Sequence, residues 1–554
     1  MCGLAGWASS GAPLDARALA TMVEALAHRT GETESVCAVI DRQPRRSVVM
    51  AAGLSSAELG LSAALDGPIV NAAELRAELA KRGYAFKEKT DVELLVRAYQ
   101  HWDKELVKHL RGAFAFALWD SRKERLMLAR DRFGQKPLHL YQSGGVLYFA
   151  SEIKALLRAP GVRSDVDMEA VGDYLRQRYV SGPRTLVSGV RKLAPGTYAL
   201  WQFGHLRETR YWSPPDGEAS GMPRSGAEPV EGFIERLDEA VRLNMASARA
   251  VGALLSGGYD SAAIVALMKR ASDAVVTFAA GFADDKKSEL PAAARIAQHL
   301  GTSHHEVVLQ RRDVLAELPA LVARRDAPFC RPADVALHLL AREAARTVQV
   351  ALSGDGGDEI LGGYRHHTVL RALAPSPKRI NGLYVIPVAD PKEPAPAEGS
   401  ASTLRRILYY EQVNWLADNL LERSDRMTAS AALELRTPFL DHRVAEYVSS
   451  LPDAARVRGL STKWILRKAA EKLLAGVKPK KAGFRIPLAD LMRGEQRELL
   501  VDHLRGAGCR TRAYYDGAVL DRLIDEHLAT KRNHEQTLWT LLNLEIWHRT
   551  YRPS

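Results

Sequence analysis

The chain has 554 residues, of which 46% are hydrophobic and 26% are charged, and its formal net charge at pH 7 is +11. This length allows two or more domains, each with its own core. We find no apolar stretch of about 20 residues, which excludes a membrane-spanning protein. The N-terminal MCGLAGWASS has neither a basic region nor a long apolar segment, so we expect no secretory signal.

The cysteines and the basic residues give further information on the protein's compartment and on its binding partners. Four cysteines occur, Cys2, Cys37, Cys330 and Cys509, and none has C-x-x-C spacing. This pattern indicates a reducing cytoplasm and argues against a zinc or redox site. No Lys/Arg run exceeds a few residues, so the positive charge fits solvated surface and anion sites better than a nucleic-acid groove. We therefore predict a cytoplasmic protein without nucleic-acid or membrane partners.

In chain order, the first part of the sequence is typical of short strands and turns. Residues 112–119, 125–130 and 146–150 are short segments rich in apolar or aromatic positions, which predicts strands. This pattern continues to about residue 212. The next segment, 213–229, is dense in proline, glycine and serine, and we predict a linker there.

Beyond the linker, predicted strands alternate with long amphipathic patterns. Residues 275–280 and 348–352 are the clearest of these strands, and the alternation indicates a parallel α/β sheet. A second loop is predicted at 389–402, where proline, alanine and glycine are frequent. Residues 402–554 are predicted to be largely helical.

The most informative segment is VGALLSGGYDSAAI at 251–264, in which an apolar strand ends in SGGYDS and a helical pattern follows. Glycine lets the backbone approach a bulky anion, and a helix N-terminus presents N–H groups to phosphates. The loop lacks the lysine of a Walker loop, which favours pyrophosphate as its ligand and leaves Asp260 to hold a magnesium ion. We predict an ATP site here.

A second glycine-rich segment, SGDGGDEILGGY at 353–364, follows the apolar VQVAL. Its acidic residues Asp355, Asp358 and Glu359 suit a metal ion that bridges them to a triphosphate. By itself such a pattern is typical of a turn or a calcium loop. Paired with the first loop across a sheet, it predicts the second wall of one site.

These two loops resemble those of the glutamine-dependent asparagine synthetase family, and the resemblance covers nearly the whole chain. The other family-like stretches are GPRTLVSGVRKLAPG (182–196), DRMTASAALELRTPFLDHRV (425–444), KWILRKA (463–469) and KKAGFRIPL (480–488). The resemblance implies an α/β protein in two parts. A class II glutamine amidotransferase αββα sandwich is expected at 1–212, and a PP-loop adenylating domain, with a parallel sheet and a largely helical tail, at 230–554.

The resemblance also implies roles for residues of the C-terminal part, with ATP and Mg²⁺ as the implied cofactors. Asp355 stands where an acidic residue takes a proton from attacking ammonia. Lys463 stands where a lysine holds the acyl-adenylate, and a fixed ammonium stabilises a developing oxyanion. Asp260 and Asp358 are the implied metal ligands. The residues implied to bind ATP and pyrophosphate are Leu254, Ser256, Gly257, Gly258, Asp260, Ser261, Ser353 and Gly354.

In the N-terminal part, the start MCGLAGW matches the family closely. Removal of Met1 would expose Cys2, whose free α-amine can act as the base for its own thiol. Asp91, in KTDVELL, matches the carboxylate that holds the amine of glutamine. The residues implied to bind glutamine are Arg45, Asp66, Gly67 and Asp91.

The stretch LDGPIVN at 65–71 departs from the family's NGEIYN, in which the Asn amide and the next Gly N–H form an oxyanion hole. Asp66 replaces that Asn, and Pro68 replaces the Glu. A carboxylate repels an oxyanion and cannot donate a hydrogen bond unless it is protonated. Loss of one such donor costs about 10²–10³ in rate. The usual HRGPD is also altered, to HRTGE at 28–32, so we expect a weak or absent glutaminase, with free ammonia or another amine serving the C-terminal part.

The predicted function is ATP-dependent amide synthesis. A carboxylate, by default L-aspartate, is activated as an acyl-adenylate with release of AMP and pyrophosphate, and is then aminated by ammonia from glutamine or solution. The alternative is an amide ligase of the β-lactam synthetase or lasso-peptide cyclase kind with an inactive glutaminase half. Loss of the NGE pattern favours this alternative, whereas Cys2 and Asp355 count against it.

Two further alternatives have less support. A tRNA-modifying PP-loop enzyme is permitted by the basic charge, but neither C-x-x-C nor a basic run supports it. A non-catalytic homologue is disfavoured because both loops and Lys463 are intact.

The surroundings of the substrate and the oligomeric state stay open. Arg331, in DAPFCRPA, is equally compatible with binding a second carboxylate of the substrate and with an exposed surface position. A homodimer is compatible with the family, and no residue fixes the oligomeric state.

Overall fold

The structure, a computed structural model, describes most of the chain. The described residues are 3–9, 17–29, 37–43, 46–52, 54–56, 60–215, 228–246, 250–282, 288–310, 313, 316–368, 402–480 and 486–552. Cys2, Arg45, most of the predicted linker and the predicted loop up to residue 401 lie outside them. The domain boundaries proposed from sequence stay predictions.

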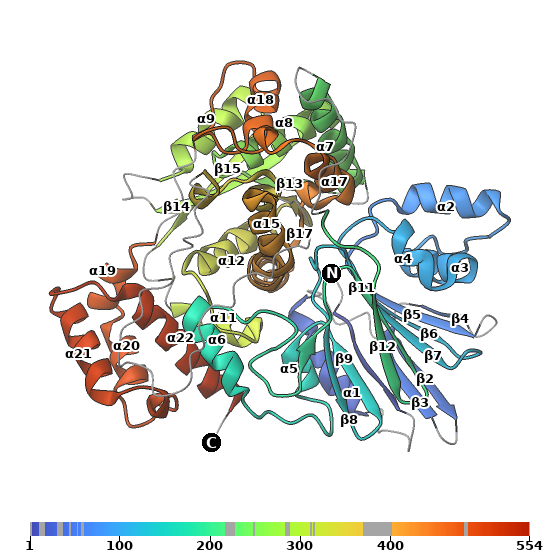
Figure 1. Cartoon of the computed structure of the whole chain (residues 1–554), viewed down its shortest axis with the longest axis horizontal. Coiled ribbons are helices and arrows are strands. Elements are labelled where there is room, and N and C mark those ends of the chain that lie inside the picture. The colour runs from blue at the N-terminus through green and yellow to red at the C-terminus, as the bar shows by residue number, and fades with distance from the viewer. Residues whose placement is uncertain are drawn as a thin grey trace.

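The N-terminal half stacks two antiparallel sheets (Figure 1). The first sheet has the order β10-β8-β9-β1-β3-β2, with β1 Ala5–Ser9, β2 Cys37–Gln43, β3 Arg46–Ala52, β8 His139–Ser143, β9 Val146–Ala150 and β10 Arg191–Lys192. The second sheet has the order β12-β11-β7-β6-β5-β4, with β4 Leu54–Ser56, β5 Leu61–Asp66, β6 Ala115–Asp120, β7 Arg125–Arg130, β11 Thr197–Gln202 and β12 His205–Arg210.

Side chains that alternate in direction along each strand form the two cores of this sandwich. Ala115 and Ala117 of β6 pack with Phe149 of β9 in the core between the sheets. Phe116 and Leu118, which point the other way, pack against helices on the outer face. Successive strand side chains point to opposite faces, so each strand contributes to two cores. The expected αββα arrangement is confirmed.

Helices cover both outer faces of the sandwich. Helices α1 and α5 contribute to the core of the first sheet, and α2 and α3 to that of the second. Their bounds, with those of the neighbouring helices, are α1 Arg17–Glu24, α2 Ala72–Lys81, α3 Asp91–Trp102, α4 Leu106–His109, α5 Ile153–Leu156 and α6 Met168–Gln177.

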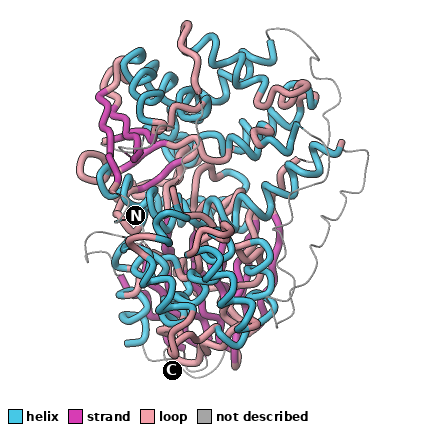
Figure 2. Tube along the Cα trace, turned by 90° about the vertical axis from the view of Figure 1, so that its left-hand side faces the viewer, coloured by secondary structure: helices cyan, strands magenta, loops and turns pink. Residues whose placement is uncertain are grey.

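The C-terminal half is built on a parallel sheet of order β15-β14-β13-β16-β17. The strands are β13 Val251–Leu254, β14 Val276–Phe282, β15 Ser303–Leu309, β16 Val350–Leu352 and β17 Glu434–Arg436. The view in Figure 2 shows this sheet above the N-terminal strands. The predicted parallel α/β architecture is therefore confirmed.

Helices pack on both faces of the parallel sheet and form the tail. Helices α7, α8, α9, α17 and α18 share one core, and α12 packs on the other face. The helices up to the tail are α7 Glu228–Ala246, α8 Tyr259–Ala271, α9 Leu290–Leu300, α11 Leu318–Arg325, α12 Ala333–Ala344, α13 Gly357–Leu361, α14 Arg365–Thr368, α15 Thr403–Tyr410, the π-helix η3 Glu411–Leu421, α16 Glu422–Ala429, α17 His442–Ser450 and α18 Trp464–Leu473. The tail contains α19 Leu488–Arg493, α20 Arg497–Leu504, α21 Gly517–Leu528 and α22 Glu535–Tyr551.

The strand predictions differ from the structure mainly at element ends. Residues 125–130 and 146–150 form β7 and β9 with the predicted bounds. The strand expected at 112–119 begins only at Ala115, because Gly112 has φ +123°, which interrupts an extended strand. The strand expected at 348–352 begins at Val350, and α7 begins at Glu228 inside the segment predicted as linker.

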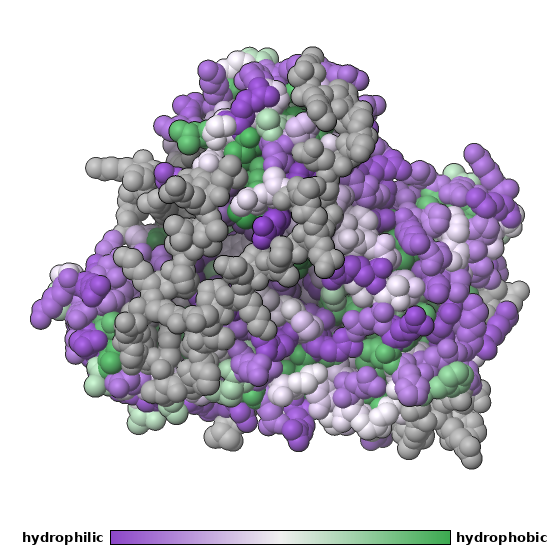
Figure 3. Space-filling model, viewed as in Figure 1, coloured by the Kyte–Doolittle hydropathy of each residue, from purple (hydrophilic) through white to green (hydrophobic). Residues whose placement is uncertain are grey.

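The described residues on one face of the molecule are mostly polar. The face seen in Figure 3 is dominated by hydrophilic residues, with hydrophobic ones scattered among them. Among the described helices, none combines the length and the apolar character that crossing a bilayer requires.

Buried ion pairs on α16 join the two halves. Asp425 accepts hydrogen bonds from Arg29 at 2.8 Å and from Lys136 at 2.9 Å. The next residue, Arg426, pairs with Glu152 at 2.6 Å. These charges are almost completely buried, and a buried charge is tolerated only when it is paired. The pairs therefore fix where α16 lies against the sandwich.

Glu422, at the start of α16, extends this network. Its carboxylate lies 2.8 Å from the ammonium of Lys192, which belongs to β10. Burial by itself would raise the pKa of Glu422, but Lys192 and the other basic groups nearby, among them His139 and Arg426, together outweigh that effect and bring the pKa down to about 2. The pKa of Asp425 is also lowered, because Arg29 and Lys136 outweigh its burial. These carboxylates stabilise the folded protein at pH values above their pKa in the unfolded state. This stabilisation is lost as the pH falls through their lower pKa in the folded state.

We therefore expect Glu422→Gln to flatten the acid dependence of stability. In the wild type, Glu422 alone should contribute about 3 kcal/mol that disappears between about pH 5 and pH 2. The thermal midpoints of wild type and variant should converge as the pH is lowered through this window, which circular dichroism can measure. Glu495→Gln, at an exposed position, is the matched control and should keep the wild-type slope. An unchanged slope in Glu422→Gln would contradict the role of this ion pair.

Candidate active site

The two glycine-rich loops leave neighbouring strands at the same edge of the parallel sheet. Strand β13 pairs with β14 on one side and with β16 on the other, so the chain connections diverge around β13. Ligands of open α/β sheets bind beyond the carboxyl ends of the strands at such a point. The loop 256–258 follows β13, and the loop 353–356 follows β16, so both lie at this location.

The first loop is closed by its own serines. The backbone N–H of Ser256 donates to Ser261 Oγ at 3.1 Å, and Ser261 Oγ donates to the Gly258 carbonyl at 3.3 Å. Gly257 has φ +73°, and a Cβ there would lie 2.7 Å from Ala292 Cβ, so both conformation and packing require glycine. Gly258 is the N-cap of the buried helix α8, whose first N–H groups point toward the loop.

The second loop packs directly on Asp260. A Cβ at Gly354 would lie 2.6 Å from Asp260 Cβ, and one at Gly357 would overlap Asp260 Oδ1. The absence of side chains at these two positions allows the loops to touch. The structure thus brings Ser353 and Gly354 beside the first loop, as the motif pairing predicted, while their binding of ATP stays a prediction.

Lys463 closes this site from a third direction. Its Nζ lies 2.6 Å from Asp260 Oδ1 and 2.6 Å from Asp358 Oδ1, and all three side chains are largely buried. Lys463 precedes α18 in the left-handed conformation, with φ +51°. A Cβ at Gly363 would overlap both Asp358 Oδ1 and Lys463 Cε, so this glycine makes room for the pair.

The same two carboxylates suit a divalent metal ion. Asp260 and Asp358 come from different loops and direct oxygen atoms at one cation. Carboxylate oxygens are the ligands that Mg²⁺ prefers. The two predicted metal ligands are therefore close enough to share an ion.

Asp355 lies in the second loop and is half-buried. Its backbone N–H donates to Ser353 Oγ at 3.3 Å, and Ser424 Oγ donates to its Oδ2 at 2.7 Å. Sequence reasoning missed Ser424, because 69 residues separate the two partners and no spacing pattern indicates such a contact.

Glu359 is a buried carboxyl that follows Asp358 in the sequence. Burial, and next the charge of Asp358, raise its pKa to about 8. The Tyr364 hydroxyl donates to Glu359 Oε1, and Gln412 of η3 donates to its backbone carbonyl at 3.1 Å. The bond from Gln412 ties α13, to which Glu359 belongs, to the π-helix.

A cluster of two histidines and a glutamate lies close to Tyr364 and Gln412 in the sequence. The Nε2 atoms of His366 and His367 lie 2.6 and 2.8 Å from the two oxygens of Glu411. The three residues have the composition of a metal site. However, His367 Nδ1 accepts the Tyr364 N–H at 3.1 Å, so neutral His367 carries its proton on Nε2, which cannot then bind a metal. The arrangement fits a hydrogen-bonded clamp better than a metal centre.

The candidate glutamine site is less complete, because Cys2 and Arg45 lie outside the described residues. Leu4 is anchored there by its N–H, which donates to Ser151 Oγ at 2.9 Å. The same Ser151 hydroxyl donates to Asp66 Oδ2 at 2.8 Å. The described start of the chain and Asp66 thus share one buried partner.

Asp66 is fully buried and paired with a cation. Arg29 Nη2 donates to Asp66 Oδ2 at 3.2 Å, while Arg29 Nη1 contacts Glu152 at 2.7 Å and Asp425 at 2.8 Å. Arg29 is completely buried, and its three carboxylate neighbours outweigh the effect of burial, so its pKa is raised. The sequence analysis noted the charge of Asp66 and its inability to donate, and the structure adds a cation that pairs with this charge. Arg29, which sequence reasoning missed, compensates it from 37 residues away.

Gly67 and Asp91, the other predicted glutamine-binding residues that the structure describes, have different surroundings. Gly67 has φ +96°, and a Cβ there would overlap the Ala113 carbonyl, so the turn after Asp66 requires glycine. Asp91 begins α3 and accepts from Arg76 at 2.7 Å and from the Ile69 N–H at 3.2 Å. Asp91 therefore has partners of its own in this structure, and its contact with glutamine stays a prediction.

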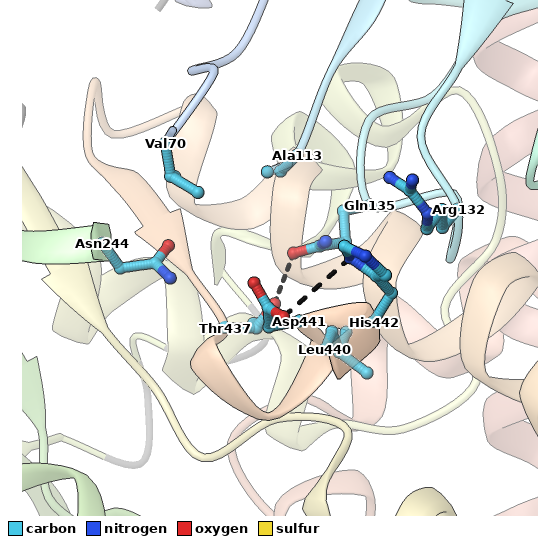
Figure 4. Close-up of a pocket in the computed structure, with 10 residues that line it drawn as sticks. Val70, Ala113, Arg132, Gln135, Asn244, Thr437, Leu440, Asp441 and His442 are labelled. Carbon is cyan, nitrogen blue, oxygen red and sulfur yellow. Dashed lines mark hydrogen bonds and ion pairs between the residues drawn. The ribbon is translucent and has the colours of Figure 1, made fainter. Parts of the chain in front are cut away.

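Cavities lie between the halves, and Arg132 of the N-terminal half lines two of them, a small one and a large one. Figure 4 shows the smaller one, where Val70, Ala113, Arg132 and Gln135 of the N-terminal half face residues of the C-terminal half. The C-terminal residues that line it are Asn244, Thr437, Leu440, Asp441 and His442. Its volume is about 20 Å³, and about 10–15 Å³ is enough for one water-sized molecule. Arg132 also lines a larger cavity of about 330 Å³.

Arg331 lies on the exposed surface. Its guanidinium stands 5.4 Å from the centre of the Trp415 ring, on η3. The structure agrees with the interpretation of Arg331 as a surface residue. Its contact with a second carboxylate of the substrate stays a prediction.

Comparison with known proteins agrees with this arrangement. The family model described as "Asparagine synthase" matches residues 232–549, and "Glutamine amidotransferase domain" matches residues 1–212. Asparagine synthetase [glutamine-hydrolyzing] 1 of Bacillus subtilis is 30% identical over 541 residues, which cover 87% of this chain and 84% of that protein. A putative asparagine synthetase of Mycobacterium tuberculosis is 32% identical, covering 87% of this chain and 83% of that protein.

A more distant relative spans less of the chain. Asparagine synthetase B of Escherichia coli is 27% identical over 434 residues, covering 74% of this chain and 67% of that protein. The matches include both halves, and one family model covers more than half of the sequence. The chain therefore belongs to the asparagine synthetase family of ATP-dependent, glutamine amidotransferase-linked ligases.

Proposed function

We propose that this protein converts a carboxylic acid, by default L-aspartate, into its amide through an acyl-adenylate, with release of AMP and pyrophosphate. The observation that carries the proposal is the junction of Asp260, Asp358 and Lys463 between two glycine-rich loops. This junction supports the proposal, because N–H groups at a helix start, two carboxylates suited to a metal ion and an ammonium lie together there.

In the first step, the substrate carboxylate attacks the α-phosphorus of ATP and pyrophosphate leaves. The N–H groups of the loop 256–258 and of the start of α8 hold the pyrophosphate. Asp260 and Asp358 would hold Mg²⁺, which supplies positive charge that neutralises the leaving group. Gly354 and Gly357 leave room for the loops to close around the phosphates, because neither has a side chain.

In the second step, an amine attacks the acyl-adenylate. Asp355 accepts the proton that the attacking ammonia loses, and Lys463 stabilises the oxyanion that develops on the acyl group. Lys463 can reach the acyl group in this step, because its long flexible side chain can move from the two carboxylates to the ligand.

The source of ammonia is the second part of the proposal. We infer that glutamine hydrolysis is weak, because Asp66 offers a carboxylate where the family uses an amide donor. Arg29 and Ser151 compensate the charge of Asp66, but they do not turn it into a donor. The amide ligase with an inactive glutaminase half remains the alternative function, and the same residue favours it. The small cavity between the halves has room for a molecule of the size of ammonia.

The main experiment measures pyrophosphate release from Mg-ATP with L-aspartate, once with glutamine and once with ammonium chloride, and identifies products by mass spectrometry. We expect asparagine with ammonium, and much less with glutamine. Adenylation of a different acid, without aspartate-dependent pyrophosphate release, would contradict the default substrate. Absence of pyrophosphate release with every acid tried would contradict the ligase mechanism.

A second prediction concerns Asp66→Asn. The Asn amide can donate where the carboxylate cannot, so glutamine hydrolysis should rise by about tenfold or more. Arg29 keeps two other carboxylate partners, so the fold should persist. The ammonium-dependent rate of the same preparation is the internal control and should not change. A wild-type glutaminase turnover on the order of 1 s⁻¹ or more would refute the assignment of a weak half.

A third prediction concerns Lys463→Met and the metal. Without Nζ, two buried carboxylates lose their cation, so the metal-free protein should lose about 3 kcal/mol of stability. Added Mg²⁺ without nucleotide should restore more stability to this variant than to the wild type, because no ammonium competes for the carboxylates. Thermal unfolding at increasing Mg²⁺, with a chelator blank, measures both effects. Lys468→Met, an exposed position on α18, is the control. Equal Mg²⁺ responses in Lys463→Met and Lys468→Met would argue against a metal site here.

A further inference from the structure

Ser424 makes a long-range hydrogen bond where a local one was available. Serine and threonine inside helices commonly donate to the carbonyl four residues earlier. Thr428, on the same helix α16, does so, since its Oγ1 donates to the Ser424 carbonyl at 2.8 Å. Ser424 Oγ instead donates to Asp355 Oδ2 at 2.7 Å, across 69 residues of sequence.

The hydroxyl of Ser424 is committed to this contact. A serine hydroxyl has a single donor, and here Asp355 takes it. Ser424 is 3% exposed, and Arg423 Nη2 lies 3.4 Å from its oxygen on the acceptor side. Rotation of the side chain would therefore break the bond to Asp355 without a gain from solvent.

The backbone at Ser424 is held equally firmly. The next two residues are Asp425 and Arg426, whose ion pairs with Arg29 and Glu152 cross to the other half at 2.8 and 2.6 Å. A donor on such a fixed element holds its partner in one geometry, which matters because a misplacement of about 1 Å can cost a catalytic group on the order of 10² in rate.

The bond also decides which oxygen of Asp355 remains open. Ser424 occupies Oδ2, and within the described residues Oδ1 has no hydrogen-bond partner. An acceptor of a proton needs one oxygen that faces the reacting amine while the rest of the carboxylate is held. This division of the two oxygens is the arrangement that a proton acceptor requires.

We propose that Ser424 is a positioning residue for amide formation, which holds Asp355 by its Oδ2 and directs Oδ1 toward the attacking amine. The inference rests on the proposed function, in which Asp355 acts after the acyl-adenylate has formed. It separates the two half-reactions: Ser424 should matter for amine attack and not for adenylation.

The test uses the full-length protein with Mg-ATP, L-aspartate and ammonium chloride. Pyrophosphate release in the first turnover without amine measures adenylation, and amide formed per pyrophosphate released measures amine attack. In Ser424→Ala the amide-to-pyrophosphate ratio should fall about tenfold, as expected when a hydrogen bond to a charged group is lost. Adenylation should remain within about twofold of wild type, and Ser424→Thr, which keeps the hydroxyl, should recover the ratio.

Ser430→Ala is the matched control, because Ser430 ends the same helix and donates to the Met427 carbonyl at 2.9 Å, away from Asp355. It should leave both measurements unchanged. A wild-type ratio in Ser424→Ala, or a parallel loss of adenylation and amide formation, would overturn the inference while leaving the proposed function standing. A wild type that releases no pyrophosphate with aspartate and ammonium would overturn both.

Discussion

The buried ion pairs of α16 fix the geometry between the halves, and both candidate sites depend on them. Asp425 is held by Arg29 and Lys136, and Arg426 by Glu152, where water cannot replace a lost partner. The same Arg29 pairs with Asp66 at the candidate glutamine site, and Ser424, the residue before Asp425, donates to Asp355 at the candidate synthetase site. One short helix thus sets side-chain positions in two centres.

The candidate nucleotide site depends on a different constraint, the close approach of two loops. Asp260 touches the second loop at positions where any Cβ would collide, so glycine at 354 and 357 is a condition for the site to close. The strand order makes this approach unavoidable, because β13 and β16 are parallel neighbours whose carboxyl ends meet at one edge. Lys463 then reaches both carboxylates from the start of α18.

Asp66 marks the limit of reasoning from a local motif. Substitution of an acid for an amide correctly identifies a lost donor, because donor capacity depends on the residue type alone. Compensation of the charge could not be predicted from the motif, because it depends on neighbours that the chain brings from residues 29 and 151. Arg29 was therefore invisible as a partner of Asp66, although it lies in the HRTGE segment already noted as altered.

The sequence by itself determined the layer architecture, the two glycine-rich loops at strand ends and the family. Strand alternation, glycine at strict turn positions and the order of motifs are local properties that a linear pattern retains. Tertiary structure alone decided which charges are paired, that Ser424 reaches Asp355, and that His366, His367 and Glu411 form a hydrogen-bonded clamp. The physical reason is distance along the chain: these contacts join residues more than 35 positions apart, and their energies come from burial, which the sequence does not encode locally.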